Sequence, residues 1–259
     1  MKLALIQMEI AEKNREGNIA HALSLLEEAT PGRDIAVLPE IWTTGYSLGK
    51  LSKEHELIDG HALTAVRAIA QKNSCAIVAG SVPLKKEDGR IYNSSIIIDK
   101  NGEIVFCYSK VHLFKMFNEE RFFAAGDNFG VYELNGITCG SSICYDLRFP
   151  ELYRHLSILG AKIIFVPAEW PEPRGYVWEL LNQARAMENN NFIVAVNCVG
   201  SFRGEPFHGH SMVVGPSGEI LVKGGANEEI LYCDIDLAAI DKVRSKINVF
   251  NDIRQELIK

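Results

Sequence analysis

The sequence lacks a long apolar run and a basic block. No apolar stretch of the 259-residue chain reaches the roughly 18 residues that crossing a bilayer requires. The opening MKLALIQMEI is interrupted by Gln7 and Glu9 before a signal-peptide core could form, so it predicts a first strand. Lys and Arg are not clustered, and the formal net charge is −6. These absences argue against a membrane partner and a nucleic-acid partner.

Motifs for metals and nucleotides are also missing. There is no CxxC, no HxxxH and no Asp-rich calcium loop, and the glycines of VKGGAN do not form a phosphate-binding fingerprint. We therefore expect no metal and no cofactor. The six cysteines are scattered singly, which favours reduced thiols and a cytoplasmic location. They are Cys75, Cys107, Cys139, Cys144, Cys198 and Cys233.

What the sequence does contain is a regular alternation of strand and helix patterns. Hydrophobic residues make up 47% of the chain and charged residues 23%, which is typical of one large globular domain spanning 1–259. Short runs rich in Val and Ile stand between segments with apolar residues at helical spacing. In the first half the patterns predict strands over 2–8, 34–38 and 75–82, helices over 17–29 and 61–73, and a hairpin over 92–99 and 103–109 that turns at Asn101-Gly102.

The second half repeats this plan. The patterns predict strands over 137–144, 162–167 and 192–198, helices over about 150–159 and 175–189, and a hairpin over 210–223. Ile-Val-Ala at 77–79 recurs at 193–195, Gly-Glu-Ile at 102–104 recurs at 218–220, and VLPEIW has a partner in FVPAEW. Because nearly all-apolar strands must be covered on both faces, we expect a four-layer α-β-β-α sandwich built from two similar halves. The tail 236–259 should dock on the domain or on a second subunit.

Three polar residues stand at the ends of predicted strands, where reactive groups of α/β sheets collect. Taken singly, Cys144 reads as a core thiol, Glu40 as a solvated acid and Lys110 as an edge residue. Together they form a chemical set. A thiol that attacks a carbonyl needs a base or a cation beside it, and Glu40 and Lys110 supply one of each. Lys110 and the backbone N–H of Tyr145 could then stabilise the resulting oxyanion.

Three sequence blocks resemble the signatures of the nitrilase, or carbon–nitrogen hydrolase, superfamily. They are LPEIWTTGY (38–46), SKVHLF (109–114) and SSICYDLRFPEL (141–152), and their order and spacing also match. The resemblance extends over nearly the whole chain. It implies the α-β-β-α fold, a homodimer, a cofactor-free amide hydrolase, and the proximity of Glu40, Lys110 and Cys144 in space.

The stretch HLFKMFNEERFFAAGD resembles the bacterial omega-amidase branch of that superfamily. This implies a fourth active-site residue at Glu119, with its neighbour Glu120 as the alternative register. It also implies a small amide substrate with a carboxylate, an omega-amide of a 2-oxo acid such as 2-oxoglutaramate. A carboxylate is best matched by a guanidinium. The candidate substrate-binding residues are Arg148 and Arg174, with Tyr46, Phe117 and Trp170 as walls.

Other interpretations remain open at this level. A deaminated-glutathione amidase, a carbamoylase or a nitrilase would use the same three residues. An acyltransferase would pass the thioester to an acceptor other than water, and a non-enzymatic scaffold would be expected to have lost a residue of the triad. His112 and His210 have no spacing that ties them to Cys144, and Cys139 falls on the opposite face of its strand. The predicted helices 150–159 and 175–189 carry more apolar residues than one buried face requires, which fits a dimer.

Overall fold

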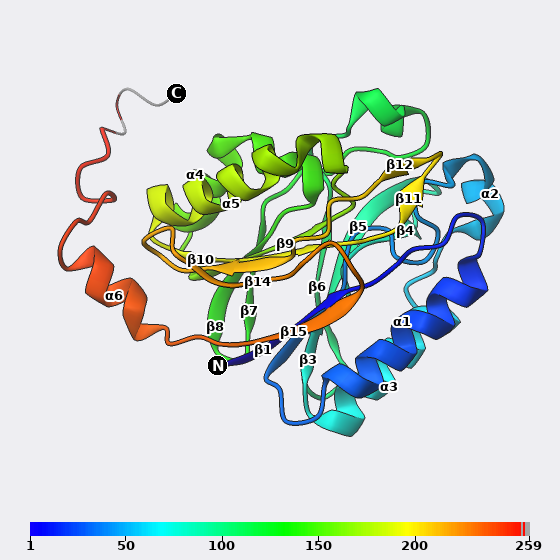
Figure 1. Cartoon of the computed structure of the whole chain (residues 1–259), viewed down its shortest axis with the longest axis horizontal. Helices are drawn as coiled ribbons and strands as arrows, with labels where there is room; N and C mark the ends of the chain where they lie inside the picture. Colours follow the sequence, from blue (N-terminus) through cyan, green and yellow to red (C-terminus); the bar gives the residue numbers. More distant parts are fainter. Residues whose placement is uncertain (255, 257–259) are drawn as a thin grey trace.

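Two large β-sheets form the centre of the molecule (Figure 1). The computed structural model describes residues 1–254 and 256. The first sheet contains β1 (Lys2–Gln7), β2 (Ile35–Val37), β3 (Ala76–Val78), β4 (Val82–Lys85), β5 (Ile91–Ile98), β6 (Ile104–Ser109) and β15 (Glu229–Asp234). The second contains β7 (Gly130–Leu134), β8 (Ile137–Ser141), β9 (Ile163–Ala168), β10 (Phe192–Asn197), β13 (Met212–Val214) and β14 (Ile220–Lys223). Strands β11 (Ser201–Phe202) and β12 (Glu205–Pro206) form a separate short ribbon.

Helices cover the outer face of each sheet. The long ones are α1 (Arg15–Ala29), α3 (His61–Asn73), α4 (Pro150–Ile158) and α5 (Gly175–Asn189), and the short ones are α2 (Leu51–Glu54) and α6 (Ala238–Arg244). The described residues also form the 3₁₀ turns η1 (Leu48–Lys50), η2 (Lys115–Phe117), η3 (Glu119–Arg121), η4 (Cys144–Arg148) and η5 (Glu172–Arg174). Figure 1 places α1 and α3 on one side of the sheets and α4 and α5 on the other.

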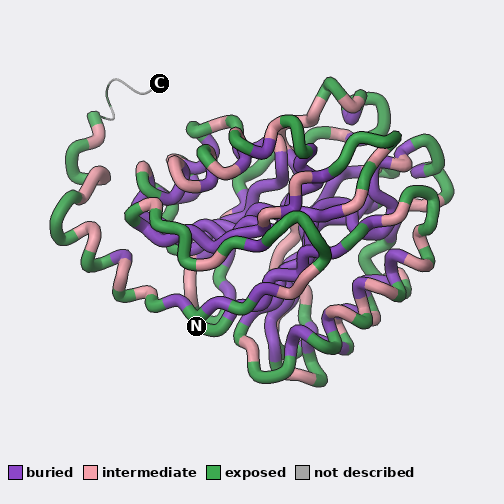
Figure 2. Tube along the Cα trace, viewed as in Figure 1, coloured by how far each residue is buried: buried purple, intermediate pink, exposed green. Residues whose placement is uncertain are grey.

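Among the described residues, three apolar cores fill the spaces between neighbouring layers. Alternate residues of β1 illustrate the arrangement, because Ala4 and Ile6 pack toward α1 and α3 while Leu3 and Leu5 pack between the two sheets. The third core lies between the second sheet and helices α4 and α5, and Trp178 is buried in it. The central strands β1, β2, β3, β9 and β10 are accordingly buried along most of their length (Figure 2). The predicted α-β-β-α sandwich is confirmed.

The two sheets share one topology. In the first, β1, β2 and β3 are parallel and β5 runs antiparallel to β3; in the second, β8, β9 and β10 are parallel and β13 runs antiparallel to β10. The repeated Ile-Val-Ala triplets begin within β3 and β10, and the Gly-Glu-Ile triplets open the second strand of each hairpin. The halves inferred from sequence repetition are therefore structural equivalents.

Two predicted strands end earlier than the apolar pattern suggests. The segment 75–82 divides at Gly80, whose φ is +52° and where a Cβ would come within 1.9 Å of the Pro39 carbonyl oxygen. The segment 137–144 leaves the sheet after Ser141, because the chain turns to begin η4 at Cys144. Strands β7 and β15 were not predicted. Each adds an antiparallel edge to a parallel set.

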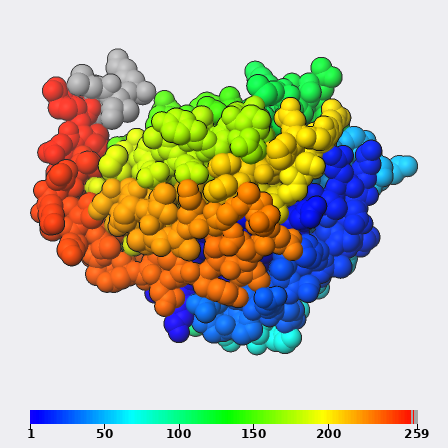
Figure 3. Space-filling view, viewed as in Figure 1, coloured from blue at the N-terminus to red at the C-terminus, as the bar shows by residue number. Residues whose placement is uncertain are grey.

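The described part of the C-terminal tail lies against its own domain. Ile240 of α6 is buried in the core between the sheets, and Arg244 donates a hydrogen bond to the Asn191 side chain at 2.9 Å. Arg154 of α4 and Arg244 both lie over the Phe250 ring. The tail therefore runs along one edge of the molecule (Figure 3). Within residues 1–254 and 256, no helix combines the length and apolar character that spanning a membrane requires.

Candidate active site

Side chains from three loops meet in a fully buried ion cluster. Glu40 follows β2, Lys110 follows β6, and Glu119 opens η3. The Lys110 Nζ donates hydrogen bonds to Glu40 Oε1 and to Glu119 Oε1, each at 2.8 Å, and all three side chains are excluded from solvent. An ammonium carries three N–H donors. Two are used by the carboxylates, so a third remains to bind an oxygen of a reacting group.

Glu40 is held in one orientation by its neighbours. The Asn93 side chain on β5 donates to its Oε1 at 2.8 Å, and the backbone N–H of Glu169 donates to its Oε2 at 2.8 Å. Because Glu169 directly follows β9, this second bond joins the end of a strand in one sheet to the end of a strand in the other. Charge-assisted bonds of this kind fix a carboxylate well.

Glu119, and not its neighbour Glu120, lies in the cluster. Glu119 is buried and Glu120 is exposed. The Tyr46 hydroxyl donates to Glu119 Oε1 at 2.8 Å, and the backbone N–H of Phe114 donates to its Oε2 at 2.7 Å. Asn118, with φ at +58°, turns the chain so that Glu119 points inward.

Cys144 stands at a sharp turn directly after the second sheet. Its φ is +45°, an uncommon value for a residue with a side chain, and it is only 5% exposed. The next residue, Tyr145, lies in the first turn of η4, where backbone N–H groups have no partner within the helix. Strain of this type clusters at functional sites. The turn therefore places the Cys144 thiol next to the Tyr145 backbone N–H, which has no acceptor within the helix.

A thiol can be activated by a base that removes its proton or by a cation that lowers its pKa, and the electrostatics of the site favour the first. Burial raises the pKa of Cys144 well above its ordinary value, the charge of Glu40 and a hydrogen bond to it add to the rise, and Lys110 opposes it only in part. Burial lowers the pKa of Lys110, but the charges of Glu119 and Glu40 outweigh it, so the net shift is upward. These shifts favour a neutral thiol at Cys144, beside Glu40, and a charged ammonium at Lys110.

The predicted substrate-binding residues occupy two connected regions. Arg148 and Trp170 lie beside Cys144, with the guanidinium 5.3 Å from the centre of the Trp170 ring. Tyr46 and Phe117 pack edge to face with ring centres 4.8 Å apart. Arg174 belongs to both regions. Its Nη2 is buried without a hydrogen-bond partner in the described part of the chain, although its Nη1 lies 3.7 Å from the Met116 sulfur.

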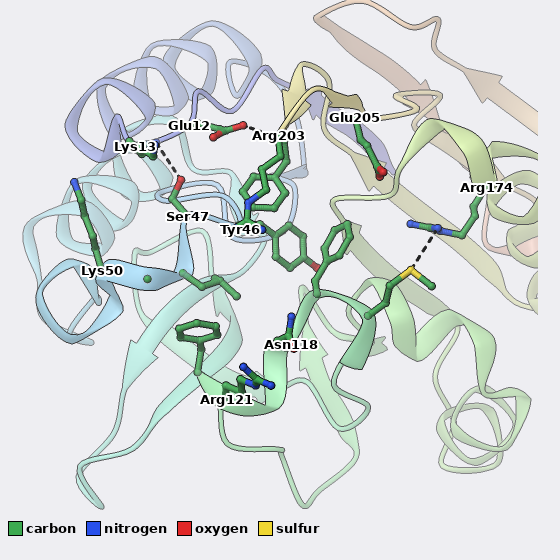
Figure 4. Close-up of a pocket in the computed structure, with 16 residues that line it drawn as sticks. Glu12, Lys13, Tyr46, Ser47, Lys50, Asn118, Arg121, Arg174, Arg203 and Glu205 are labelled. Carbon is green, nitrogen blue, oxygen red and sulfur yellow. Dashed lines mark hydrogen bonds between the residues drawn. The ribbon is translucent and has the colours of Figure 1, made fainter.

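A large cavity opens beside a very small one. The large cavity has a volume of about 720 Å³, and Figure 4 shows Tyr46 near its centre and Arg174 at one edge. The small cavity next to Cys144 has a volume of about 20 Å³, enough for roughly one water molecule. The residues that line it are Phe114, Cys144, Tyr145, Arg148, Glu169, Trp170, Pro171 and Arg174. The bulk of any ligand must therefore lie in the larger space.

Comparison with known proteins identifies the family. The carbon–nitrogen hydrolase family model matches residues 2–245. The chain belongs to the carbon–nitrogen hydrolase family. It is similar to a 2-oxoglutaramate amidase of Bacillus subtilis, with 40% identity over 98% of both chains. It is also similar to the human omega-amidase NIT2, with 31% identity over 99% of this chain and 96% of the relative.

A solved structure of the same superfamily has the same fold. It is a CN-hydrolase superfamily protein from Xanthomonas campestris with an arsenic adduct in its active site. The TM-score is 0.90 at 30% identity, covering 98% of this chain and 97% of the other. The carbon–nitrogen hydrolase described here is thus an enzyme that hydrolyses carbon–nitrogen bonds, as its sequence blocks indicated.

Sequence reasoning missed two acids of this hydrolase. Asp146 connects the Cys144 turn to the loop that carries Lys110, and Glu169 shares the small cavity with Cys144. The signal for Glu169 was present, because FVPAEW was recognised as the repeat partner of VLPEIW, which contains Glu40. No comparable signal pointed to Asn93, which lies within an otherwise strand-like run.

One further cluster of potential ligands lies away from the thiol. Glu179, His208 and His210 place their ligand atoms within 4.8 Å of one another. The Lys223 ammonium already donates to Glu179 at 3.0 Å, and His210 Nδ1 is bonded to the His208 carbonyl oxygen at 2.6 Å. One oxygen of Glu179 is therefore already paired with a cation.

Proposed function

We propose that this hydrolase cleaves the terminal carboxamide of a small carboxylate-bearing substrate, an omega-amide of a 2-oxo acid such as 2-oxoglutaramate, to the acid and ammonia. The observation that carries the proposal is the juxtaposition of Cys144, the Glu40–Lys110–Glu119 cluster and Arg174, whose Nη2 has no hydrogen-bond partner among the described residues. The first two supply amide chemistry, and the third supplies a site for an anion. The names of the similar amidases point the same way.

In the first half-reaction Cys144 is the nucleophile. Glu40 accepts the thiol proton as Sγ bonds to the amide carbon, and the carbonyl oxygen becomes an oxyanion. The free N–H of Lys110 and the backbone N–H of Tyr145 hold that oxyanion. Glu40 then gives its proton to the amide nitrogen, the carbon–nitrogen bond breaks, and ammonia leaves a thioester on Cys144.

In the second half-reaction water replaces ammonia. Glu40 accepts a proton from the water, whose oxygen attacks the thioester carbonyl, and the same two donors hold the new oxyanion. The carbon–sulfur bond then breaks, and the sulfur recovers its proton from Glu40. Glu119, which is bound to Lys110 and Tyr46, orients the ammonium throughout. No cofactor enters either step.

The lining of the large cavity supports an anionic substrate. Its basic residues are Lys13, Lys50, Arg121, Arg174 and Arg203, and its acidic residues are Glu12 and Glu205. Arg174 is the basic residue that also borders the small cavity beside Cys144. We therefore assign the substrate carboxylate to Arg174. Arg148 is exposed and lies over Trp170, so its role is to shape the wall of the site.

Ammonia release from a panel of amides tests the function. The panel contains 2-oxoglutaramate, a deaminated-glutathione-like amide, an N-carbamoyl amino acid and a simple nitrile. We expect the highest kcat/KM with 2-oxoglutaramate and none with Cys144→Ala. A higher value for another compound would reassign the substrate. Transfer of the acyl group to an added amine would indicate an acyltransferase, and inactivity toward all would favour a scaffold.

Intact mass spectrometry tests the nucleophile separately. Incubation with an electrophilic amide analogue should add one label, on the peptide that contains Cys144. Cys107 is the half-buried competitor, so Cys107→Ser serves as the matched background. Labelling at the buried Cys139 instead would end the assignment of Cys144.

We also propose that the working form is a homodimer. Helices α4 and α5 leave large apolar side chains exposed, among them Ile158, Tyr176, Leu180 and Met187. Helix α4 begins just after the Cys144 turn, so a partner packed on these helices would support the turn that aims the thiol.

A further inference from the structure

Glu169 is a buried acid that the two half-reactions leave without a role. It directly follows β9 and is 1% exposed. Its backbone N–H binds Glu40, but both of its side-chain oxygens are buried without a hydrogen-bond partner among the described residues. An unsatisfied buried carboxyl costs about 1–3 kcal/mol of stability, so folds rarely keep one without a function.

The position of this carboxyl is close to the reacting atoms. Glu169 lines the small cavity together with Cys144 and Arg174. On its other side it borders a second small cavity, of about 10 Å³, with Gly45 and Tyr46. Gly45 lies next to the Glu169 carboxyl, since a Cβ at that position would be in van der Waals contact with Glu169 Oε1 at 3.5 Å. An acyl chain bonded to the Cys144 sulfur starts in the space that Glu169 faces.

Burial and the neighbouring charges favour the uncharged form of Glu169. Burial raises the pKa of Glu169 well above its ordinary value, the charges of Glu40 and Glu119 raise it further, and Lys110 opposes them. Tyr46 borders one small cavity with Glu169, and Arg148 and Arg174 border the other. A neutral carboxyl has one O–H donor, whereas an ionised one can only accept and would repel an anionic substrate.

We propose that Glu169 is a specificity-determining residue whose hydroxyl donates a hydrogen bond to the 2-oxo oxygen of the substrate. This rests on the proposed function, in which Arg174 binds the carboxylate of the same molecule. The two oxygen-bearing groups of a 2-oxo acid would then have separate partners on the wall of one cavity. An amide without the keto group would leave the Glu169 hydroxyl unpaired.

Two variants and two substrates test the inference. Glu169→Gln keeps an N–H donor of similar shape, and Glu169→Met keeps the approximate volume without a hydrogen-bonding group. The substrates are 2-oxoglutaramate and glutaramate, which is the same amide acid without the keto oxygen. We expect Glu169→Met to lower kcat/KM for 2-oxoglutaramate about tenfold or more, with glutaramate changed less than about threefold. Glu169→Gln should retain most of the discrimination.

Thermal unfolding separates this role from a structural one. Replacing an unpartnered acid by a buried apolar side chain should raise Tm in Glu169→Met, even as the preference for the 2-oxo acid is lost. An equal loss on both substrates, or an unchanged ratio between them, overturns the inference. A wild-type enzyme that hydrolyses neither amide but releases ammonia from another overturns the proposed function, and that failure is visible before any variant is made.

Discussion

One oxygen of Asp146 accepts two hydrogen bonds from His112. The backbone N–H of His112 donates to Oδ1 at 2.9 Å, and its ring Nδ1 lies 2.8 Å from the same atom. The other oxygen, Oδ2, accepts from the Tyr108 hydroxyl at 2.8 Å and from the Ile143 backbone N–H at 3.0 Å. Asp146 thus ties the turn that presents Cys144 to the segment that presents Lys110.

This arrangement predicts that Asp146→Asn is severely impaired. All four groups around the carboxylate are donors, so an amide would face two of them with its own N–H groups. We expect stability to fall by about 2–4 kcal/mol and kcat to fall at least tenfold in the folded protein. Urea unfolding and steady-state kinetics measure the two effects. Asp59→Asn, at an exposed position, is the control. Unchanged kcat would contradict the proposed coupling.

A second prediction concerns the charge balance around Lys110. Lys110→Met leaves Glu40 and Glu119 buried without their cation, which should cost about 3–5 kcal/mol of stability. It also removes a proposed oxyanion donor, so kcat should fall at least about a hundredfold, with a smaller change in KM. Adding Glu119→Gln removes one of the buried charges. The double variant should recover part of the stability and none of the activity.

Lys162→Met, at an exposed position, is the matched control for this pair of variants. Recovery of kcat in the double variant would mean that Lys110 serves only to neutralise Glu119. In that case the oxyanion role would pass to Tyr145 and another donor.

The raised pKa of Glu169 predicts how stability varies with pH. Above its ordinary value of 4.5 the unfolded chain releases this proton, while the folded protein keeps it because of burial and of the charges on Glu40 and Glu119. The protonated side chain therefore makes its full contribution to stability below pH 4.5. As pH rises from 4.5 toward the pKa of the folded protein, that contribution is lost at about 1.4 kcal/mol per pH unit. Glu169→Gln has no such proton.

Urea unfolding of wild type and Glu169→Gln at pH 5 to 8 measures this effect. The free energy of unfolding of the variant, relative to wild type, should increase as pH rises. A difference that stays constant over this range would show that Glu169 titrates normally.

The exposed apolar side chains of α5 predict the assembly. Tyr176 is 78% exposed and Leu180 is 48% exposed, on a helix that also buries Trp178. Light scattering should give twice the 28.8 kDa of one chain. Leu180→Glu should shift the mass toward the monomer and lower activity, whereas Leu221→Glu, on the exposed strand β14, should do neither. A fully active wild-type monomer would exclude the dimer as a requirement.

Periodicity predicted the elements that are determined locally. The amphipathic pattern of 61–73 coincides with α3, and the Asn101-Gly102 turn joins β5 to β6. Strand β15 was missed because its stability comes from β1, more than two hundred residues earlier in the chain. Such a pairing leaves little trace in the local sequence. The same limit applies to the turn at Cys144, where Asp146 forms hydrogen bonds with the distant residues Tyr108 and His112 and the chain leaves the strand despite its apolar sequence.

The candidate site was partly predictable for a similar reason. Glu40, Lys110 and Cys144 were selected because each stands at the end of a predicted strand and because the order of the three sequence blocks resembles that of the superfamily. The choice between Glu119 and Glu120 depended on the positive φ of Asn118, and a backbone angle of this kind cannot be predicted from the local amino-acid composition. The protonation of the thiol depended on burial, and only packing determines burial.

The placement of Glu40 and Cys144 on different sheets has a consequence for how the protein matures. Glu40 follows β2 and Cys144 follows β8, so neither half of the chain carries both the proposed base and the proposed nucleophile. A growing chain must extend past Glu169 before the hydrogen bond that fixes Glu40 can form. Contacts between distant segments form late, since they require the largest loop closures. Recovery of activity during refolding should therefore lag behind the appearance of secondary structure and report the docking of one sheet on the other.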